Sequence, residues 1–211
     1  MKKLIVSIFM CMGLLTSAQT FSVAMEKAVA ACVGLSESIG STSTAGLKAA
    51  NMALKKADIV YFGDLWLEKG KDLSVDGHFI FDEEFVDSLA ENRLIIKFSS
   101  RYMRKRASWG PGGTGGRIKM TTLALEAGAS AVWKSVNRKL AEYALVAEPG
   151  GLFTMTIRDE KGRALYSETV NNKQGAKVRK AQIKLPDKIT KLYIEIKNTG
   201  RNDASFALLS N

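Results

Sequence analysis

Near the N-terminus, apolar residues recur with the spacing of an amphipathic helix. Intervals of three and four residues place them on one helix face. This first stripe consists of Phe21, Met25, Ala28, Cys32, Leu35 and Ile39. A second stripe, after the turn-forming run 40–43, consists of Leu47, Ala50, Leu54 and Ala57. The pattern predicts an antiparallel helical hairpin over residues 19–57, with Ser43 or Thr44 as the cap of the second helix. Because both stripes are rich in alanine, we expect the hairpin to dock on another part of the protein.

Beyond residue 117, the apolar period changes to that of a strand. Eight candidate strands, separated by turn residues, cover 117–125, 131–136, 140–148, 152–158, 163–170, 176–185, 191–197 and 204–209. In the clearest of them, Phe153, Met155 and Ile157 alternate with polar neighbours, as expected where one face of a strand is buried. Such strands without helices predict a mainly antiparallel β-sandwich over 117–211, of jelly-roll or immunoglobulin-like type. The fold class is therefore expected to be α+β.

The residues between the hairpin and the sandwich have a mixed pattern. A short strand is expected at 78–81, and Asp82 can cap a helix whose early carboxylates suit the positive end of the helix dipole. Residues 58–109 are therefore expected to form a mixed α/β segment. The glycine-rich run 110–116 indicates a hinge that marks the boundary of the sandwich domain.

The first residues have the three parts of a secretory signal peptide. A basic start at Lys2 and Lys3 precedes an apolar run over 4–15, and small residues lead up to Ala18. The run of about 12 residues is shorter than the roughly 20 that a membrane-spanning helix needs, and no other segment predicts a membrane span. We expect a signal peptide over 1–18 and export to the periplasm, the cell surface or the medium. Cleavage after Ala24 is the second candidate.

Removal of the signal peptide would leave Cys32 as the only cysteine. An internal disulfide is then impossible, so stability must come from packing. Cys32 lies on the apolar stripe of the first predicted helix, which favours a buried, inert thiol over a disulfide between chains.

Charge is distributed unevenly along the chain, whose formal net charge is +10. Residues 19–92 carry 6 basic and 12 acidic side chains, whereas residues 93–211 carry 23 basic and 9 acidic ones. The two parts thus have net charges of −6 and +14, and Lys2 and Lys3 supply the remaining +2. A basic second half can bind a polyanion, attract the acidic first half, or simply keep the protein in solution.

The densest group of cations is a candidate binding surface. It comprises Arg101, Tyr102, Arg104, Lys105, Arg106 and Trp109. Arginine forks bind sulfate, carboxylate or phosphate, and the two aromatic rings can stack on sugars. The alternative is an exposed loop whose charges are only solvated. A second surface for sugars would consist of Trp133, Tyr143, Tyr166 and Tyr193. At least two of these rings are expected to fill the core.

No combination of residues predicts catalysis or a metal site. His78 is the only histidine, and its spacing assigns it no acidic partner. One histidine and one cysteine far apart do not form a zinc site. The carboxylates of 82–87 gather at an expected helix start, where capping explains them. The glycine-rich run lacks the Gly-Lys-Ser/Thr sequence of a phosphate loop. We therefore expect no catalytic residue, no metal and no cofactor.

The C-terminal part resembles a known type of module. The residues concerned lie in the runs 123–128, 143–151, 157–162, 192–198 and 205–209. They resemble the pre-peptidase C-terminal type of secreted β-sandwich, over somewhat under half of the chain. The whole chain, with its segment 76–82, is similar to exported proteins of Gram-negative gut bacteria. The resemblance implies a sandwich that accompanies secreted hydrolases as an accessory module, and it implies no site residues.

These patterns favour an exported, non-enzymatic binding or adhesion module that contacts glycans or anionic polymers. The alternative is a structural or interaction protein that assembles with a protein partner through its helical hairpin. An enzyme with an unrecognised site is the third interpretation. Export argues against nucleic acid as a partner.

Overall fold

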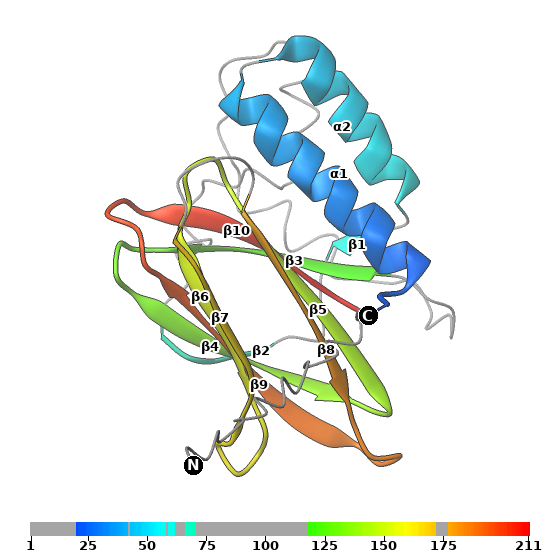
Figure 1. The fold of residues 1–211 in the computed structure, drawn as a ribbon, viewed down its shortest axis with the longest axis vertical. Coiled ribbons are helices and arrows are strands. Elements are labelled where there is room, and N and C mark those ends of the chain that lie inside the picture. Colours follow the sequence, from blue (N-terminus) through cyan, green and yellow to red (C-terminus); the bar gives the residue numbers. More distant parts are fainter. Residues whose placement is uncertain (1–19, 42, 58, 62–65, 71–117, 172–176) are drawn as a thin grey trace, which may run out of the picture.

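The computed structural model describes residues 20–41, 43–57, 59–61, 66–70, 118–171 and 177–211. Two helices, α1 (Val23–Gly40) and α2 (Thr44–Lys56), come first. Among the described residues they are followed by ten strands: β1 (Ile59–Tyr61), β2 (Trp66–Lys69), β3 (Ile118–Leu125), β4 (Ser130–Asn137), β5 (Leu140–Ala147), β6 (Phe153–Arg158), β7 (Ala164–Val170), β8 (Val178–Lys184), β9 (Thr190–Asn198) and β10 (Ala204–Ser210). The predicted α+β class is confirmed, with the hairpin on one side of a sandwich (Figure 1).

The strands form two five-stranded sheets with jelly-roll connectivity. Sheet A has the order β1-β3-β10-β5-β8, and sheet B has the order β2-β4-β9-β6-β7. Apart from the β6–β7 hairpin, each strand from β3 onward lies in the opposite sheet from the strand before it. This crossing pattern places each sheet's four main strands in the order of a jelly roll, which decides between the two sandwich types that the sequence allows.

The predicted eight strands are confirmed, and two short strands were missed. β1 joins the edge of sheet A parallel to β3, and β2 joins the edge of sheet B antiparallel to β4. Both precede the glycine-rich run, so the sandwich also recruits residues from the segment predicted as mixed α/β. Strands of three and four residues are too short to show a clear period. The predicted elements at 78–91 and the hinge at 110–116 lie outside the described residues.

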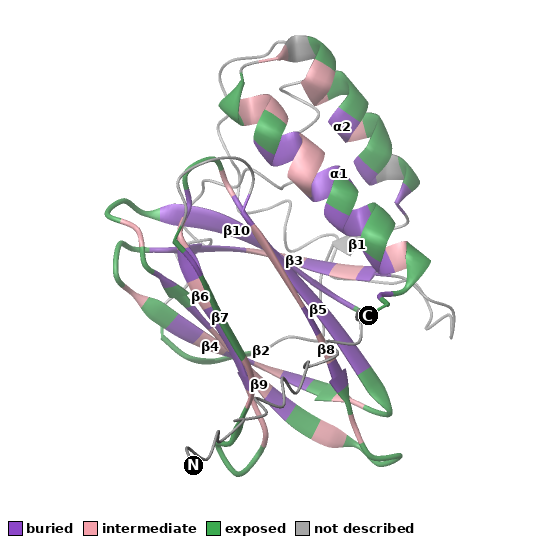
Figure 2. Cartoon of the chain, viewed as in Figure 1, coloured by how far each residue is buried: buried purple, intermediate pink, exposed green. Residues whose placement is uncertain are grey.

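Sheet A is buried on both faces, and sheet B mainly on one. β10 is buried at every position and β5 at every position after Leu140, whereas buried and more exposed residues alternate along β9 (Figure 2). One core layer lies between the sheets, where the rings of Phe153 and Phe206 meet edge to face with centroids 5.7 Å apart. A second layer lies between sheet A and the hairpin. The expected docking of the hairpin is thus confirmed, and sheet A supplies the surface.

Polar contacts fix α1 on sheet A at several points. The Ser36 hydroxyl donates to the Ala147 carbonyl at 2.9 Å, and Lys180 Nζ lies 2.6 Å from a Glu26 carboxylate oxygen. Ser43, one of the two expected caps, caps α2, its hydroxyl accepting from the Gly46 amide at 3.1 Å. These contacts orient the hairpin above the apolar layer that it shares with sheet A.

Cys32 is buried in the layer between α1 and sheet A. Its side chain is fully buried, with Sγ 3.7 Å from the sulfur of Met120. Burial raises the pKa of the thiol to about 12, so the neutral thiol is strongly favoured. The prediction of a buried thiol is confirmed.

Across the described residues, no helix has both the length and the hydrophobicity needed to cross a membrane.

Candidate anion-binding surface

The binding residues predicted from the sequence are outside the part of the chain that the structure describes. This holds for the cluster of Arg101, Tyr102, Arg104, Lys105, Arg106 and Trp109. His78 and the carboxylates of 82–87 lie outside it too. These predictions therefore stay predictions.

The aromatic surface predicted on the sandwich does not form as a set. Trp133 and Tyr143 are 2% and 0% exposed and belong to the core between the sheets. The Asn137 side-chain amide donates to the Tyr143 hydroxyl at 2.6 Å, which satisfies that buried group. Tyr166 is half-buried against the same core, and Tyr193 is half-buried in β9. The expectation that at least two of the four rings fill the core is confirmed, and a platform that includes Trp133 and Tyr143 is wrong.

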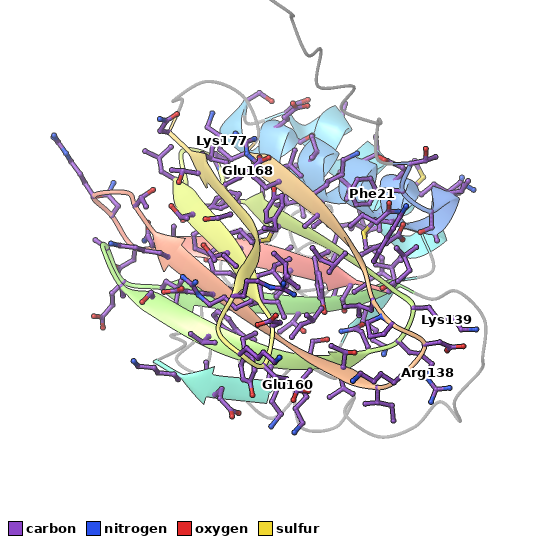
Figure 3. All side chains as sticks on the ribbon, turned by 60° about the horizontal axis from the view of Figure 1, so that its bottom comes forward. Phe21, Arg138, Lys139, Glu160, Glu168 and Lys177 are labelled. Carbon is purple, nitrogen blue, oxygen red and sulfur yellow. The ribbon has the colours of Figure 1, made fainter. Side chains whose placement is uncertain are left out.

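Three connections meet at the end of the sandwich opposite the helical hairpin (Figure 1). They are the β4–β5 connection at 138–139, the β6–β7 turn at 159–163 and the β8–β9 connection at 185–189. The Lys139 amide donates to the Pro186 carbonyl at 3.3 Å, and the Leu185 amide donates to the Lys139 carbonyl at 2.7 Å. The Lys191 amide donates to Glu160 Oε1 at 3.1 Å, which ties the β6–β7 turn to the start of β9. Figure 3 shows Arg138 beside Lys139, with Glu160 apart from them in the β6–β7 turn.

A depression of about 570 Å³ lies between two of these connections. Its lining combines charged turn residues with apolar side chains: Asp159, Glu160, Lys161, Arg163, Leu165, Lys184, Leu185, Pro186, Lys188, Ile189 and Thr190. Ile189 is 63% exposed, so the lining includes one large apolar side chain that is open to solvent. We refer to these lining residues, together with Arg138, Lys139, Asp187 and Lys191, as the basic end.

Cations outnumber carboxylates at the basic end. Seven cations lie there, namely Arg138, Lys139, Lys161, Arg163, Lys184, Lys188 and Lys191, against the three carboxylates Asp159, Glu160 and Asp187. The formal charge of this end is therefore 7 − 3 = +4. Two cations have ion-pair partners: Arg163 Nε is 3.1 Å from Asp159, and Lys139 Nζ is 3.6 Å from Asp187. Within the described residues, Lys161, Lys184 and Lys188 have no carboxylate within 4.0 Å.

Asp159 holds the β6–β7 turn in shape. Its Oδ1 accepts from the Lys161 amide at 3.0 Å and the Arg163 amide at 2.9 Å, and Arg163 Nε lies 3.1 Å from Oδ2. Desolvation opposes ionisation of this carboxyl, but the hydrogen bonds and the Arg163 charge outweigh it, and the pKa of Asp159 is lowered. The Asp159 carboxylate is thus committed to the turn and to Arg163, so Lys161 is not neutralised by it.

The chemistry available at the basic end is binding of anions. Ammonium groups attract sulfate, carboxylate and phosphate as point charges, and apolar lining residues such as Leu185 and Ile189 can contact the non-polar part of a ligand. Among the described residues, no three His, Cys, Asp or Glu side chains come together as a metal site would require.

The basic end was not predictable from the sequence, because its charged residues are far apart along the chain. The seven cations come from three connections and the strand ends beside them, so no dense run marks them in the sequence. The available signals were the net charge of +14 over residues 93–211 and the turn sequence Asp159-Glu160-Lys161-Gly162, which alone did not identify a surface.

Comparison with known proteins gives only distant similarities in structure. No protein-family model matches this chain, and no curated protein matches it. Its sandwich is similar to the pre-peptidase C-terminal domain of a Bacillus anthracis collagenase, at 11% identity and a TM-score of 0.27, covering 44% of this chain and 76% of that domain. It is also similar to a family 35 carbohydrate-binding module from Cellvibrio japonicus, at 10% identity and a TM-score of 0.26, covering 41% of this chain and 67% of that module.

A third similar structure is the enzymatically active domain of tailspike protein 4 from bacteriophage CBA120, at 11% identity and a TM-score of 0.31. The match covers 43% of this chain and spans only 15% of the tailspike chain. At identities and TM-scores this low, the assignment of a jelly-roll sandwich rests on the strand order of this chain alone. A pre-peptidase C-terminal domain is among the similar structures, whereas no comparison supports the similarity to exported proteins of gut bacteria.

Proposed function

We propose that this protein is an exported, non-enzymatic binding module whose basic end holds an anionic glycan or a similar anionic polymer. The observation on which the proposal depends is the set of three exposed lysines, Lys161, Lys184 and Lys188, around a depression with an exposed apolar residue. Exposed cations without acidic partners keep their full attraction for an external anion.

The framework beneath these lysines supports binding with little reorganisation. Asp159 fixes the β6–β7 turn, and backbone hydrogen bonds join Lys139 to Leu185 and Pro186. A surface whose backbone is already fixed loses less conformational entropy when a ligand binds. The depression of about 570 Å³ is also within the usual range of small-ligand sites, which corresponds here to a few sugar units of a longer chain.

The alternative function, assembly with a protein partner through the helical hairpin, has less support. The apolar stripes that suggested it pack against each other and against sheet A, including Met25, Leu35 and Leu54. They are therefore not free to meet another chain. Among the described residues of the hairpin, Val23 and Met52 are the large apolar side chains that stay exposed.

Retention of the mature protein on heparin and on polygalacturonate, over a series of NaCl concentrations, tests the proposal. We expect retention at low salt and elution as salt rises, because ion pairing with a polymer releases bound counterions. Replacing Lys161, Lys184 and Lys188 together by Gln should weaken binding by about tenfold or more and lower the salt slope by about one for each lysine removed.

A matched variant separates the basic end from net charge. Lys27, Lys48 and Lys56 are exposed lysines of the helical hairpin, and their replacement by Gln changes the net charge by the same amount. We expect this variant to bind like the unmodified protein. Equal losses in both triple variants, or no retention at low salt, would overturn the proposal. A further variant with Arg101, Arg104, Lys105 and Arg106 replaced by Gln measures the contribution of the cluster predicted from the sequence.

A further inference from the structure

The residues just before α1 are an integral part of the folded protein. The Phe21 side chain is 8% exposed and belongs to the apolar layer between the hairpin and sheet A. Lys180 Nζ lies 4.8 Å from the centroid of its ring, a cation–π distance. The Thr20 carbonyl accepts from the Gln182 side-chain amide at 2.9 Å, which joins this segment to β8.

Ser22 connects this segment to a buried carboxylate. Its amide donates to Glu142 Oε1 at 2.8 Å and its hydroxyl donates to Oε2 at 2.6 Å. Gln182 Nε2 also donates to Oε1, at 3.1 Å. Glu142 is 2% exposed in β5, and a buried carboxylate is stable only when both oxygens have hydrogen-bond donors. Ser22 supplies two of the three donors described here, so Glu142 depends on it.

Ser22 has a second role at the start of α1. Its hydroxyl oxygen accepts from the Met25 amide at 3.2 Å, which caps the first turn of the helix. One side chain thus joins the helix cap to the buried Glu142. Removing residues 19–24 would remove the cap, the buried Phe21 ring and two donors to Glu142 in one step.

This arrangement discriminates between the two cleavage positions that the sequence offers. We propose that signal peptidase hydrolyses the Ala18–Gln19 bond and leaves residues 19–24 in the mature protein, an inference that rests on the proposed export. Water adds across the peptide bond: its hydroxyl completes the Ala18 carboxyl group, and its remaining proton passes to the Gln19 nitrogen, which becomes the new amine as the C–N bond breaks. Cleavage after Ala24 would give a chain without the Ser22 hydrogen bonds to Glu142 and without the buried Phe21 ring.

The test is the N-terminus of the exported protein. The full chain is produced in a Gram-negative host, recovered from the periplasm and medium, and measured by intact-mass spectrometry. We expect a chain that begins at Gln19, or its cyclised form lighter by one ammonia. A chain that begins at Met25, or one that keeps Met1, would overturn the inference.

Two variants of the full chain sharpen this test. Because the signal peptide is removed before the chain folds, an effect of either substitution on folding does not change the cleavage that is measured. Ala18→Arg should leave the precursor uncut, whereas Ala24→Arg should be processed like the unmodified chain. The opposite result would overturn the inference. Two chains can also be produced without a signal peptide, one starting at Met25 and one at Gln19. The chain that starts at Met25 should unfold at a lower urea concentration. Retention on anionic polymers can be scored on the leaderless Gln19 chain, so failure of the binding proposal and failure of this inference are distinguishable.

Discussion

Ser22 donates both its backbone amide and its hydroxyl to the carboxylate of Glu142, at 2.8 and 2.6 Å, across 120 positions of the sequence. Glu142 interrupts an otherwise apolar strand, and it is among the few buried charged residues within the described part of the chain. The two hydrogen bonds from Ser22 explain why a carboxylate is tolerated there. They also anchor the first turn of α1 to sheet A.

Replacing Glu142 by Gln should therefore destabilise the protein. Glutamine is neutral and offers one acceptor oxygen in place of two, so the charge-assisted hydrogen bonds from Ser22 and Gln182 would be weakened or lost. We expect a loss of about 1–3 kcal/mol in the free energy of unfolding, measured by urea denaturation. Glu126, exposed in the turn after β3, provides the control, and Glu126→Gln should leave the stability unchanged. Equal stability of both variants would contradict a role for the buried pair.

Gly46 permits the close approach of the two helices. A Cβ at this position would lie 2.5 Å from Ser38 Oγ and 3.1 Å from Ser38 Cβ. Alanine is the better helix former by about 1 kcal/mol, but the steric conflict should reverse the sign. We expect Gly46→Ala to lower the stability by about 1–2 kcal/mol in thermal or urea unfolding.

Gly34 provides the matched control for Gly46. It lies in α1, and a Cβ there would meet nothing within 4 Å. Gly34→Ala should therefore raise the stability, by up to about 1 kcal/mol. The two substitutions are chemically identical and lie in the same hairpin. Changes of the same sign would show that the helix contact at Gly46 does not govern the outcome.

The buried Cys32 should resist thiol reagents in the native protein. Burial raises its pKa to about 12, so at pH 8 almost no thiolate is present, and access is blocked by α1 and sheet A. Labelling with iodoacetamide, read by peptide mass, should be negligible at pH 8 and complete in urea. Native labelling at the rate of a free thiol would contradict the observed packing.

Glu148 should make stability depend on pH in the mildly acidic range. Desolvation by burial raises the pKa of Glu148, although the Ser205 amide, 3.1 Å from Oε1, partly opposes this. The folded state therefore binds the proton more tightly than the unfolded state. Its favourable contribution is complete below the ordinary glutamate pKa and is lost as pH rises through the raised folded value.

Glu148→Gln should remove this dependence. Glutamine keeps an oxygen for the Ser205 amide and does not ionise. Relative to the unmodified protein, the variant should gain stability as pH rises from 4 to 7, measured by urea unfolding at each pH. Glu126→Gln again serves as the control, with no such trend expected. A constant difference across the range would show that Glu148 is not the responsible group.

Much of the local structure was predictable because periodicity is a local property of a chain. The stripe from Phe21 to Ile39 predicted α1, and the alternation of Phe153, Met155 and Ile157 predicted β6 with its buried face. The predicted bounds of the eight main strands agree with the observed ones to within two residues. The alanine-rich stripes also predicted that the hairpin must dock, because they bury too little area alone.

Contacts between distant segments were not predictable in the same way. The basic end combines lysines from separate connections, and only the jelly-roll crossing of the strands brings Lys161 and Lys188 to one depression. The sequence predicted that at least two of four aromatic rings fill the core, but only the strand faces decide that these are Trp133 and Tyr143. β1 and β2 gain their structure from pairing with β3 and β4, since neither is long enough to show a period.

The sequence by itself thus determined the two helices and the eight main strands, and which of their residues seek burial. The tertiary structure decided which surface each segment covers: sheet A beneath the hairpin, Ser22 against Glu142, and three turns at one end. The physical reason is that the repeat of apolar side chains along a helix or strand depends on residues that are close together in the sequence. The position of each segment depends instead on the free energy gained when the two apolar layers are buried. Residues far apart in the sequence contribute to that free energy together.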